Sequence, residues 1–287
     1  MFKRMFITFG VLVAAYAALL KWMPVTYDTG QHLQGSNRIK AEGYLYGEGA
    51  APNDVIVGSS LAFRMVSDSL PSGTYNLAVG GLSLQEGLDL ISKSGRWPKR
   101  VFVEANILFR KYDQGFMDKV SDPVMMAARE KVPMLREKNQ PSGWLFGWVK
   151  QRAKEQVGAD GAASTELDGN TEVAGRFMLD EQLEHYKRIP GEDTVQQHLE
   201  RLASSVAELE RHGTHVVFFE MPLDTRLMEM PLAEASRALI AKHFPGNAYV
   251  QPDMAKGYIT TDGLHLRKES AARWSGDFRR MTEGALQ

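Results

Sequence analysis

The feature that most constrains the fold is a short run of β-branched residues that ends at a glycine and two serines. Val55-Ile56-Val57 is followed by Gly58-Ser59-Ser60 and then by residues that favour a short helix to about Ser69. A strand that stops at a tight turn before a helix exposes the next hydroxyl at its carboxyl end, where open α/β sheets place their sites. The glycine permits the sharp turn. These residues alone do not decide between Ser59 and Ser60.

The same alternation of strand and helix recurs along the chain. Further strands are predicted at 75–79, 101–103, 216–219 and 249–250, and longer helices at 84–95, 193–213 and 233–243. The helix at 84–95 is preceded by Ser83, which has the capping-box spacing to Glu86. Strands that alternate with helices in this way predict an α/β fold with a parallel sheet and helices on both of its faces.

Residues 111–190 interrupt the alternation and predict a helical insertion. Helices are expected at 123–138 and 143–156, and the polar run 158–169 predicts a mobile loop. The most apolar part is the Trp-Leu-Phe-Gly-Trp-Val segment at 144–149. Two interpretations are open for this segment. In the first, the segment packs against the core. In the second, it forms a surface that meets a membrane or an integral-membrane partner, since Trp is enriched at membrane–water interfaces.

The N-terminus carries an apolar segment with a basic start. Lys3 and Arg4 precede an almost wholly apolar stretch that continues to Leu20. One interpretation is a cleaved signal peptide, because Ala15-Tyr16-Ala17 fits the spacing of a small-residue cleavage site. The apolar residues continue past that site, which favours an uncleaved signal anchor.

As an anchor, residues 5–23 reach the length of a membrane span if the Lys21 side chain extends to the interface. The basic residues lie before the segment, so the positive-inside rule leaves the N-terminus in the cytoplasm. The sequence therefore predicts a single-pass inner-membrane protein whose remaining residues lie in the periplasm. Its parts are an anchor at 1–23, a juxtamembrane linker at 24–52 with a short hairpin around Tyr44, and one domain at 53–287.

Composition excludes several classes of function. The chain has 287 residues with 44% hydrophobic content, enough for one large domain with a sizeable core. Its net charge of −1 gives no broad positive field, so no nucleic-acid partner is expected. Cysteine is absent, which excludes disulfides, thiolate catalysis and cysteine-based metal sites. Neither a Walker pattern nor a His-Glu-x-x-His motif occurs, so no metal or nucleotide cofactor is predicted.

A serine hydroxyl becomes a good nucleophile only when a base takes its proton and a third group orients the base. The chain has seven histidines, and His265 stands apart because it follows Asp262 by three residues in a loop. This spacing can hold the carboxylate against one ring nitrogen while the other faces a substrate. The remaining histidines lie in predicted helices, at a strand start or in the linker: His32, His185, His198, His212, His215 and His243.

Four segments together resemble the ordered blocks of the SGNH (GDSL-like) hydrolase superfamily, over roughly 54–110 and 193–280. They are Gly58-Ser59-Ser60-Leu61, Asn-Leu-Ala-Val-Gly-Gly at 76–81, Glu104-Ala105-Asn106 and Asp262-Gly263-Leu264-His265. The resemblance implies a three-layer, flavodoxin-like sheet. It also implies a nucleophile at Ser60 with Asp262 and His265 as its partners. The oxyanion hole would come from the N–H groups of Ser60 and Gly81 and the side chain of Asn106.

The chain departs from the family pattern at three positions. Ser59 stands where the family has Asp in the first block. In the third block, Glu104 stands where the family has Gly, and Ile107 stands where it has Asp. Two of the three departures lie in the block that contributes Asn106.

The Gly-Ser-Ser block behind a membrane anchor resembles a narrower group, the anchored SGNH-like proteins that O-acetylate alginate and cellulose or D-alanylate teichoic acids. This resemblance implies a serine acyltransferase that passes an acyl group through Ser60 to a hydroxyl of an exported polysaccharide. Its partner would be a membrane-bound O-acyltransferase. No cofactor is implied, since the acyl donor is that partner or a small acyl ester. Two alternatives stay open: an envelope esterase with the same triad, and a non-catalytic scaffold of a polysaccharide-export complex.

Overall fold

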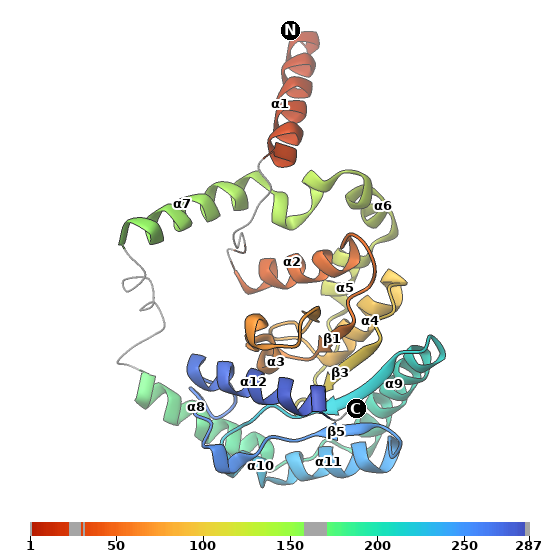
Figure 1. The fold of residues 1–287 in the computed structure, drawn as a ribbon, viewed down its shortest axis with the longest axis vertical. Coiled ribbons are helices and arrows are strands. Elements are labelled where there is room, and N and C mark those ends of the chain that lie inside the picture. Colours follow the sequence, from red (N-terminus) through yellow and green to blue (C-terminus); the bar gives the residue numbers. More distant parts are fainter. Residues whose placement is uncertain (1, 23–29, 31, 158–170, 285–287) are drawn as a thin grey trace. The chain divides into compact units, whose positions relative to one another are not determined.

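The computed structural model describes residues 2–22, 30, 32–157 and 171–284. The chain divides into two compact units. The first combines Met1–Gly43 with Lys119–Glu166, and the second combines Tyr44–Asp118 with Leu167–Gln287. The sheet lies within the second unit, and Figure 1 labels the helices of both units and those strands for which there is room.

Five parallel strands form the sheet, in the order β2-β1-β3-β4-β5. Their bounds are β1 Asp54–Val57, β2 Thr74–Asn76, β3 Arg100–Glu104, β4 His215–Phe219 and β5 Ala248–Val250. This is the strand order of flavodoxin-like doubly wound folds. The structure confirms the predicted α/β class and the parallel sheet. Strand β2 is shorter than predicted, since residues 77–79 continue beside β1 without being part of the strand.

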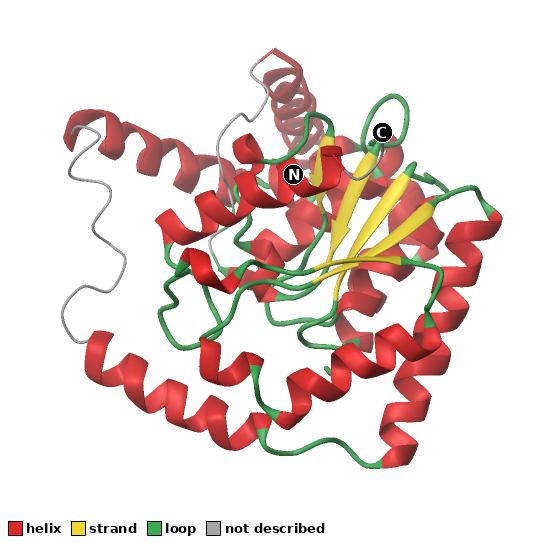
Figure 2. Ribbon diagram, turned by 60° about the horizontal axis from the view of Figure 1, so that its bottom comes forward, coloured by secondary structure: helices red, strands yellow, loops and turns green. Residues whose placement is uncertain are grey.

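Helices lie on both sides of the sheet (Figure 2). The second unit contains α3 Ser60–Phe63, α4 Leu84–Ser94, α8 Thr171–Tyr186, α9 Glu192–Arg211, α10 Thr225–Met228, α11 Pro231–His243 and α12 Lys268–Gly284. Short 3-10 turns are η1 Ser67–Ser69 and η4 Met254–Lys256, and α5 Gln114–Ser121 crosses the boundary between the units. The sequence predicted α4, α9 and α11, but it did not predict α8, α10 or α12. The short helix predicted to about Ser69 is divided into α3 and the turn η1.

Alternate side chains of the strands face opposite layers. Phe102 of β3 and Phe219 of β4 belong to a buried cluster with Trp274 and Phe278 of α12. The ring of Phe278 packs against both strand residues, with centroids 5.0 and 5.1 Å apart. Val57 of β1 faces the other layer, where α4 comes very close. The core therefore fixes α12 on one face and α4 on the other, and between them the carboxyl ends of the strands carry the candidate site.

The first unit begins with α1 (Phe2–Trp22), a helix of 21 residues that is long and apolar enough to cross a membrane. It also contains α2 Leu33–Leu45 up to Gly43, α6 Pro123–Lys131, α7 Pro141–Val157 and the 3-10 turns η2 Pro133–Leu135 and η3 Glu137–Asn139. The position of α1 agrees with the predicted anchor segment.

Two predictions about this part of the chain need correction. The segment 24–52, predicted as a linker with a hairpin, contains helix α2. Within the first unit, α2 is held by ion pairs from Glu42 to Arg129, 3.3 Å, and from Arg38 to Glu137, 2.8 Å. The segment 111–190, predicted as an insertion on the core domain, is divided, because its residues 119–166 group with the N-terminal residues. The predicted mobile loop at 158–169 lies outside the described residues.

Gly87 supplies a stability test of the close contact between α4 and β1. A Cβ at Gly87 would lie 2.9 Å from the side chain of Val57. Replacing glycine with alanine in a helix ordinarily raises the free energy of unfolding by up to about 1 kcal/mol. Overpacking a core lowers it by about 1–3 kcal/mol. We expect Gly87→Ala to lower the free energy of unfolding by roughly 1 kcal/mol in urea titrations of the full chain in detergent.

Gly276→Ala on α12 is the matched control. A Cβ there meets only the end of the Arg280 side chain, at 3.9 Å. The free energy of unfolding should therefore rise, by up to about 1 kcal/mol. Equal shifts for the two variants would show that the contact between α4 and β1 is not as tight as described.

Candidate active site

Ser60 stands at the first position of helix α3, directly after the turn that ends β1. Ser59 is the N-cap of α3, and its buried hydroxyl accepts a hydrogen bond from the N–H of Leu61 at 3.2 Å. Ser60 is only partly buried. The N-cap role turns the Ser59 side chain back to the helix, and Ser60 is left at the carboxyl edge of the sheet. This answers the question that the sequence left open, since the second serine is the accessible one.

Ser60, His265 and Asp262 form a continuous chain of contacts. The Oγ of Ser60 lies 2.8 Å from Nε2 of His265, and Nδ1 of His265 lies 2.6 Å from Oδ2 of Asp262. The loop that carries Asp262 and His265 is closed by a bridge between Thr260 and Leu266. The structure therefore brings together three residues that the sequence analysis had named from segments two hundred positions apart.

Asp262 is held in place by backbone groups as well as by the imidazole. Its Oδ1 accepts hydrogen bonds from the N–H of His265 at 2.7 Å and from the N–H of Leu264 at 3.0 Å. Burial raises the pKa of Asp262, but the hydrogen bonds and the charge of His265 outweigh burial and lower the pKa to about 2. The carboxylate is thus ionised at neutral pH. It can hold Nδ1 of His265 as the protonated nitrogen, which leaves Nε2 free to accept the proton of Ser60.

The carboxylate of Glu104, at the end of β3, lies against the turn that carries Ser60. Its Oε2 accepts hydrogen bonds from the N–H of Ser59 at 2.8 Å and from the N–H of Ala62 at 3.2 Å. The hydroxyl of Ser59 lies 3.0 Å from both carboxylate oxygens. Burial raises the pKa of Glu104, and the hydrogen bonds from Ser59 and Ala62 oppose this rise. Because the first N–H groups of a helix lack partners within the helix, Glu104 fixes the start of α3.

Gly58 is required by the same contact. A Cβ at Gly58 would lie 2.6 Å from Oε2 and 2.7 Å from Cβ of Glu104. Any larger residue at position 58 would push the carboxylate away from the backbone of Ser59. The glycine predicted to permit a sharp turn therefore also makes room for a buried acid.

The proposed oxyanion donors lie on loops that follow β2 and β3. Nδ2 of Asn106 donates to the carbonyl of Met221 at 3.0 Å, and the N–H of Met221 donates to Oδ1 of Asn106 at 2.6 Å. One N–H of the Asn106 amide is thereby engaged, and the second has no partner within the described part of the chain. Gly81 has a φ of 76°, the left-handed region that favours glycine. Its loop runs beside the turn at Gly58, whose carbonyl accepts from Val79 at 3.0 Å.

Two cavities, of about 310 and 260 Å³, lie along the residues that follow β3. The larger is lined by Asn106 and by Leu264, the residue before His265, although Ser60 is not among the described residues that line either cavity. Leu108 and Arg110 line both cavities, so the two adjoin. The ionisable side chains that line them are arginines, a lysine, histidines and tyrosines: Arg110, Lys111, Tyr112, His185, Tyr186, Arg188, His198 and Arg201.

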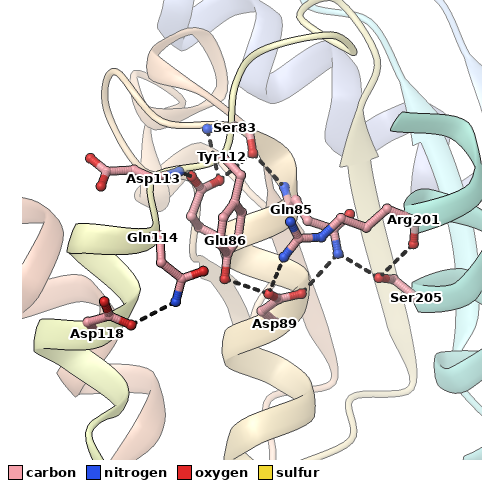
Figure 3. Close-up of polar contacts among 10 residues, drawn as sticks. All are labelled: Ser83, Gln85, Glu86, Asp89, Tyr112, Asp113, Gln114, Asp118, Arg201 and Ser205. Atoms are coloured by element: carbon pink, nitrogen blue, oxygen red, sulfur yellow. Dashed lines mark hydrogen bonds and ion pairs between the residues drawn. The ribbon is translucent and has the colours of Figure 1, made fainter. Parts of the chain in front are cut away.

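A polar network stiffens the wall of the smaller cavity (Figure 3). Asp89 of α4 accepts hydrogen bonds from the hydroxyl of Tyr112 at 2.7 Å, from Arg201 of α9 at 2.8 Å and from Gln85 at 2.9 Å. The guanidinium of Arg201 also lies 3.7 Å from the centre of the Tyr112 ring. Asp89 therefore neutralises Arg201. By contrast, the Arg110 side chain makes no hydrogen bond or ion pair within the described residues, although its charge helps to lower the pKa of the buried Glu104 carboxyl.

Sequence analysis did not identify Glu104 or Arg110 as functional residues. Glu104 was noted only as a departure from the family pattern. The available signal was an acidic residue directly after the apolar run at 101–103, where burial requires a partner. Arg110 had no comparable signal, since its position between the two cavities depends on residues from α8 and α9.

The low pKa of Asp262 predicts how Asp262→Asn changes stability with pH. A carboxyl whose pKa falls from 3.8 to about 2 on folding stabilises the folded state by about 2 kcal/mol above its unfolded pKa. This contribution is lost as the pH falls through 3.8 toward 2. The deficit in unfolding free energy of Asp262→Asn should therefore be largest near neutral pH and shrink below about pH 4. Urea unfolding of both chains at a series of pH values measures it, and a deficit independent of pH would contradict it.

We also compared the chain with protein-family models, with curated proteins and with solved structures, and none of them matches it.

Proposed function

We propose that this protein is a membrane-anchored O-acetyltransferase of the cell envelope, which moves an acetyl group through an ester on Ser60 to a hydroxyl of an exported polysaccharide. The observation that carries the proposal is the chain of contacts from Ser60 through His265 to Asp262, at 2.8 and 2.6 Å. These are the distances needed by a nucleophile, its base and the group that orients the base. The resemblance to SGNH hydrolases and the strand order support it.

The proposed reaction has two halves. In the first, Oγ of Ser60 attacks the carbonyl carbon of the acetyl donor and gives its proton to Nε2 of His265. The imidazolium, stabilised by Asp262, passes that proton to the departing group. In the second, a sugar hydroxyl gives its proton to Nε2 and attacks the ester, and Ser60 recovers a proton as it leaves. The charge on the carbonyl oxygen would be met by the N–H groups of Ser60 and Gly81 and by the Asn106 amide, each worth about 2.7–4 kcal/mol.

The cellular setting is part of the proposal. Lys3 and Arg4 lie in the first turn of α1, before its apolar residues, which favours a cytoplasmic N-terminus and a periplasmic site. An acetyl group made in the cytoplasm must then cross the membrane. We assign that step to a membrane-bound O-acyltransferase partner, which would present the acetyl group to Ser60.

An envelope esterase is the second candidate, and the exposure of the site favours it. The His265 side chain is 22% exposed and Ser60 is partly exposed, so water can reach both. The two enzymes differ only in the acceptor that attacks the ester. A non-catalytic scaffold is less well supported. Ser59 and Glu104 both depart from the family pattern, but their side chains form a hydrogen bond with each other. Together they hold the start of α3 in place.

The adjoining cavities are the best-supported place for the acceptor. Every charged side chain that lines them is an arginine or a lysine, in a chain whose net charge is −1. Arg110 lines both and has no ion-pair partner within the described residues. Guanidinium groups bind carboxylates in a bidentate fashion. The proposed acceptor is therefore a polysaccharide with carboxylate-bearing sugars.

The first test of this function labels the nucleophile. The full chain in detergent is incubated with an activated aryl acetate, with and without oligosaccharides, and acetyl is followed by mass spectrometry. We expect acetyl on Ser60 and faster transfer to sugar than to water. Ser60→Ala should lower the rate at least about 1,000-fold.

Ser59→Ala is the matched control for this experiment. It removes a buried hydroxyl that caps α3, so it should slow the reaction without abolishing the label on Ser60. Release of free acetate without sugar transfer would favour the esterase. Acetyl transfer that survives Ser60→Ala would contradict both enzymes and favour the scaffold.

Arg110→Gln tests the acceptor. Loss of one charge-assisted hydrogen bond is worth about 1.5–3 kcal/mol, so the KM for an acidic oligosaccharide should rise at least about tenfold. The KM for a neutral oligosaccharide should change little. Arg211→Gln removes the same charge from the exposed end of α9, outside both cavities, and should change neither value. Equal KM values for acidic and neutral acceptors in the unaltered chain would exclude a carboxylate-specific site but leave the acetyl transfer intact.

A further inference from the structure

Helix α7 has its large apolar side chains on the outside. Leu145, Phe146, Trp148 and Val149 are 55, 51, 41 and 52% exposed. The two glycines of the same stretch, Gly143 and Gly147, are four residues apart and are the buried ones. A helix of a water-soluble domain does the opposite, since its apolar stripe faces the core. Within the first unit, these four side chains are therefore not packed in a core.

The start of α7 is joined to the apolar helix α1 within the first unit. The hydroxyl of Tyr16 donates a hydrogen bond to the carbonyl of Asn139 at 2.7 Å, two residues before α7 begins. Tyr16 lies six residues before the end of α1 at Trp22, which is about 9 Å along the helix axis. If α1 spans a membrane with Trp22 at the interface, Tyr16 lies about 9 Å below that interface, a depth that the apolar face of an interfacial helix reaches. Helix α7 then begins at that depth.

The charge of α7 fits the surface of an anionic membrane. The guanidinium of Arg152 lies 5.6 Å from the centre of the Trp148 ring, one turn away on the helix. The sequence adds Lys150 and Lys154, and no acidic residue occurs from 141 to 154. Aromatic and aliphatic residues interleaved with arginine and lysine are typical of helices that lie in the interface. Each cation near an anionic surface adds attraction.

We infer that α7 lies in the membrane–water interface beside α1, with Leu145, Phe146, Trp148 and Val149 among the upper parts of the lipid chains and Arg152 at the head groups. The first unit would then contact the bilayer through two helices, one that crosses it and one that lies on it. This inference rests on the membrane location of α1. It is independent of the acetyl-transfer chemistry.

The test uses the absence of cysteine in the chain. Phe146→Cys in the full chain is labelled with an environment-sensitive fluorophore and reconstituted into vesicles of phosphatidylcholine and phosphatidylglycerol in equal amounts. Spin-labelled lipids, with the spin label either near the glycerol or near the chain end, quench the fluorophore according to its depth. We expect strong quenching at position 146, several-fold greater for the shallow spin label than for the deep one.

Two reference positions make the outcome specific. Leu12→Cys, at the middle of α1, should be quenched more by the deep spin label. If it is not, the result contradicts the membrane location of α1, on which the inference about α7 rests. Lys242→Cys, exposed on α11, should not be quenched by either. Leu145→Cys repeats the measurement if the first variant does not fold.

Two results at position 146 would overturn the inference. A label open to aqueous iodide and untouched by lipid spin labels would show that α7 is in water. A label shielded from both iodide and lipid would show that protein covers α7, either the second unit or a second copy of this chain.

Discussion

The parallel register of β1 with β3 is the constraint on which the candidate site depends. Val57 pairs with Val103, so the next residues, Gly58 and Glu104, meet at the edge of the sheet. There the carboxylate of Glu104 accepts the N–H groups that begin α3. A shift of one residue would turn every side chain of the strand to the opposite face. The apolar runs of both strands therefore also determine where the Ser60 hydroxyl stands.

The rest of the site reaches this edge because carboxyl ends of parallel strands lie together. Asn106 follows β3 directly, and its amide is bound to the backbone of Met221 beyond β4. The loop of Asp262 and His265 lies between β5 and α12, whose Trp274 and Phe278 are fully buried. The imidazole is thus held by a helix anchored in the core, and its distance to Ser60 depends on packing as much as on local hydrogen bonds.

The sequence predicted those parts whose signal is local. Buried apolar runs identified β1, β3 and β4. The strands β2 and β5, whose residues are not fully buried, were predicted from shorter segments. The spacing of Asp262 and His265 singled out the loop that contacts Ser60. Helix α2 was missed because it is polar, with few periodic apolar residues, and is held by Arg129 and Glu137, about ninety positions away. The buried partner of Ser59 was missed for a similar reason, since only the sheet brings Glu104 beside it. Contacts between distant segments carry no pattern in one sequence.

The contact between Gly58 and Glu104 has a consequence for how this sequence can vary over time. A side chain at position 58 collides with the carboxylate, and a shorter residue at position 104 leaves buried N–H groups without an acceptor. Neither position can change alone without harm, whereas a joint change can restore the fit. We therefore expect substitutions at positions 58 and 104 to occur together.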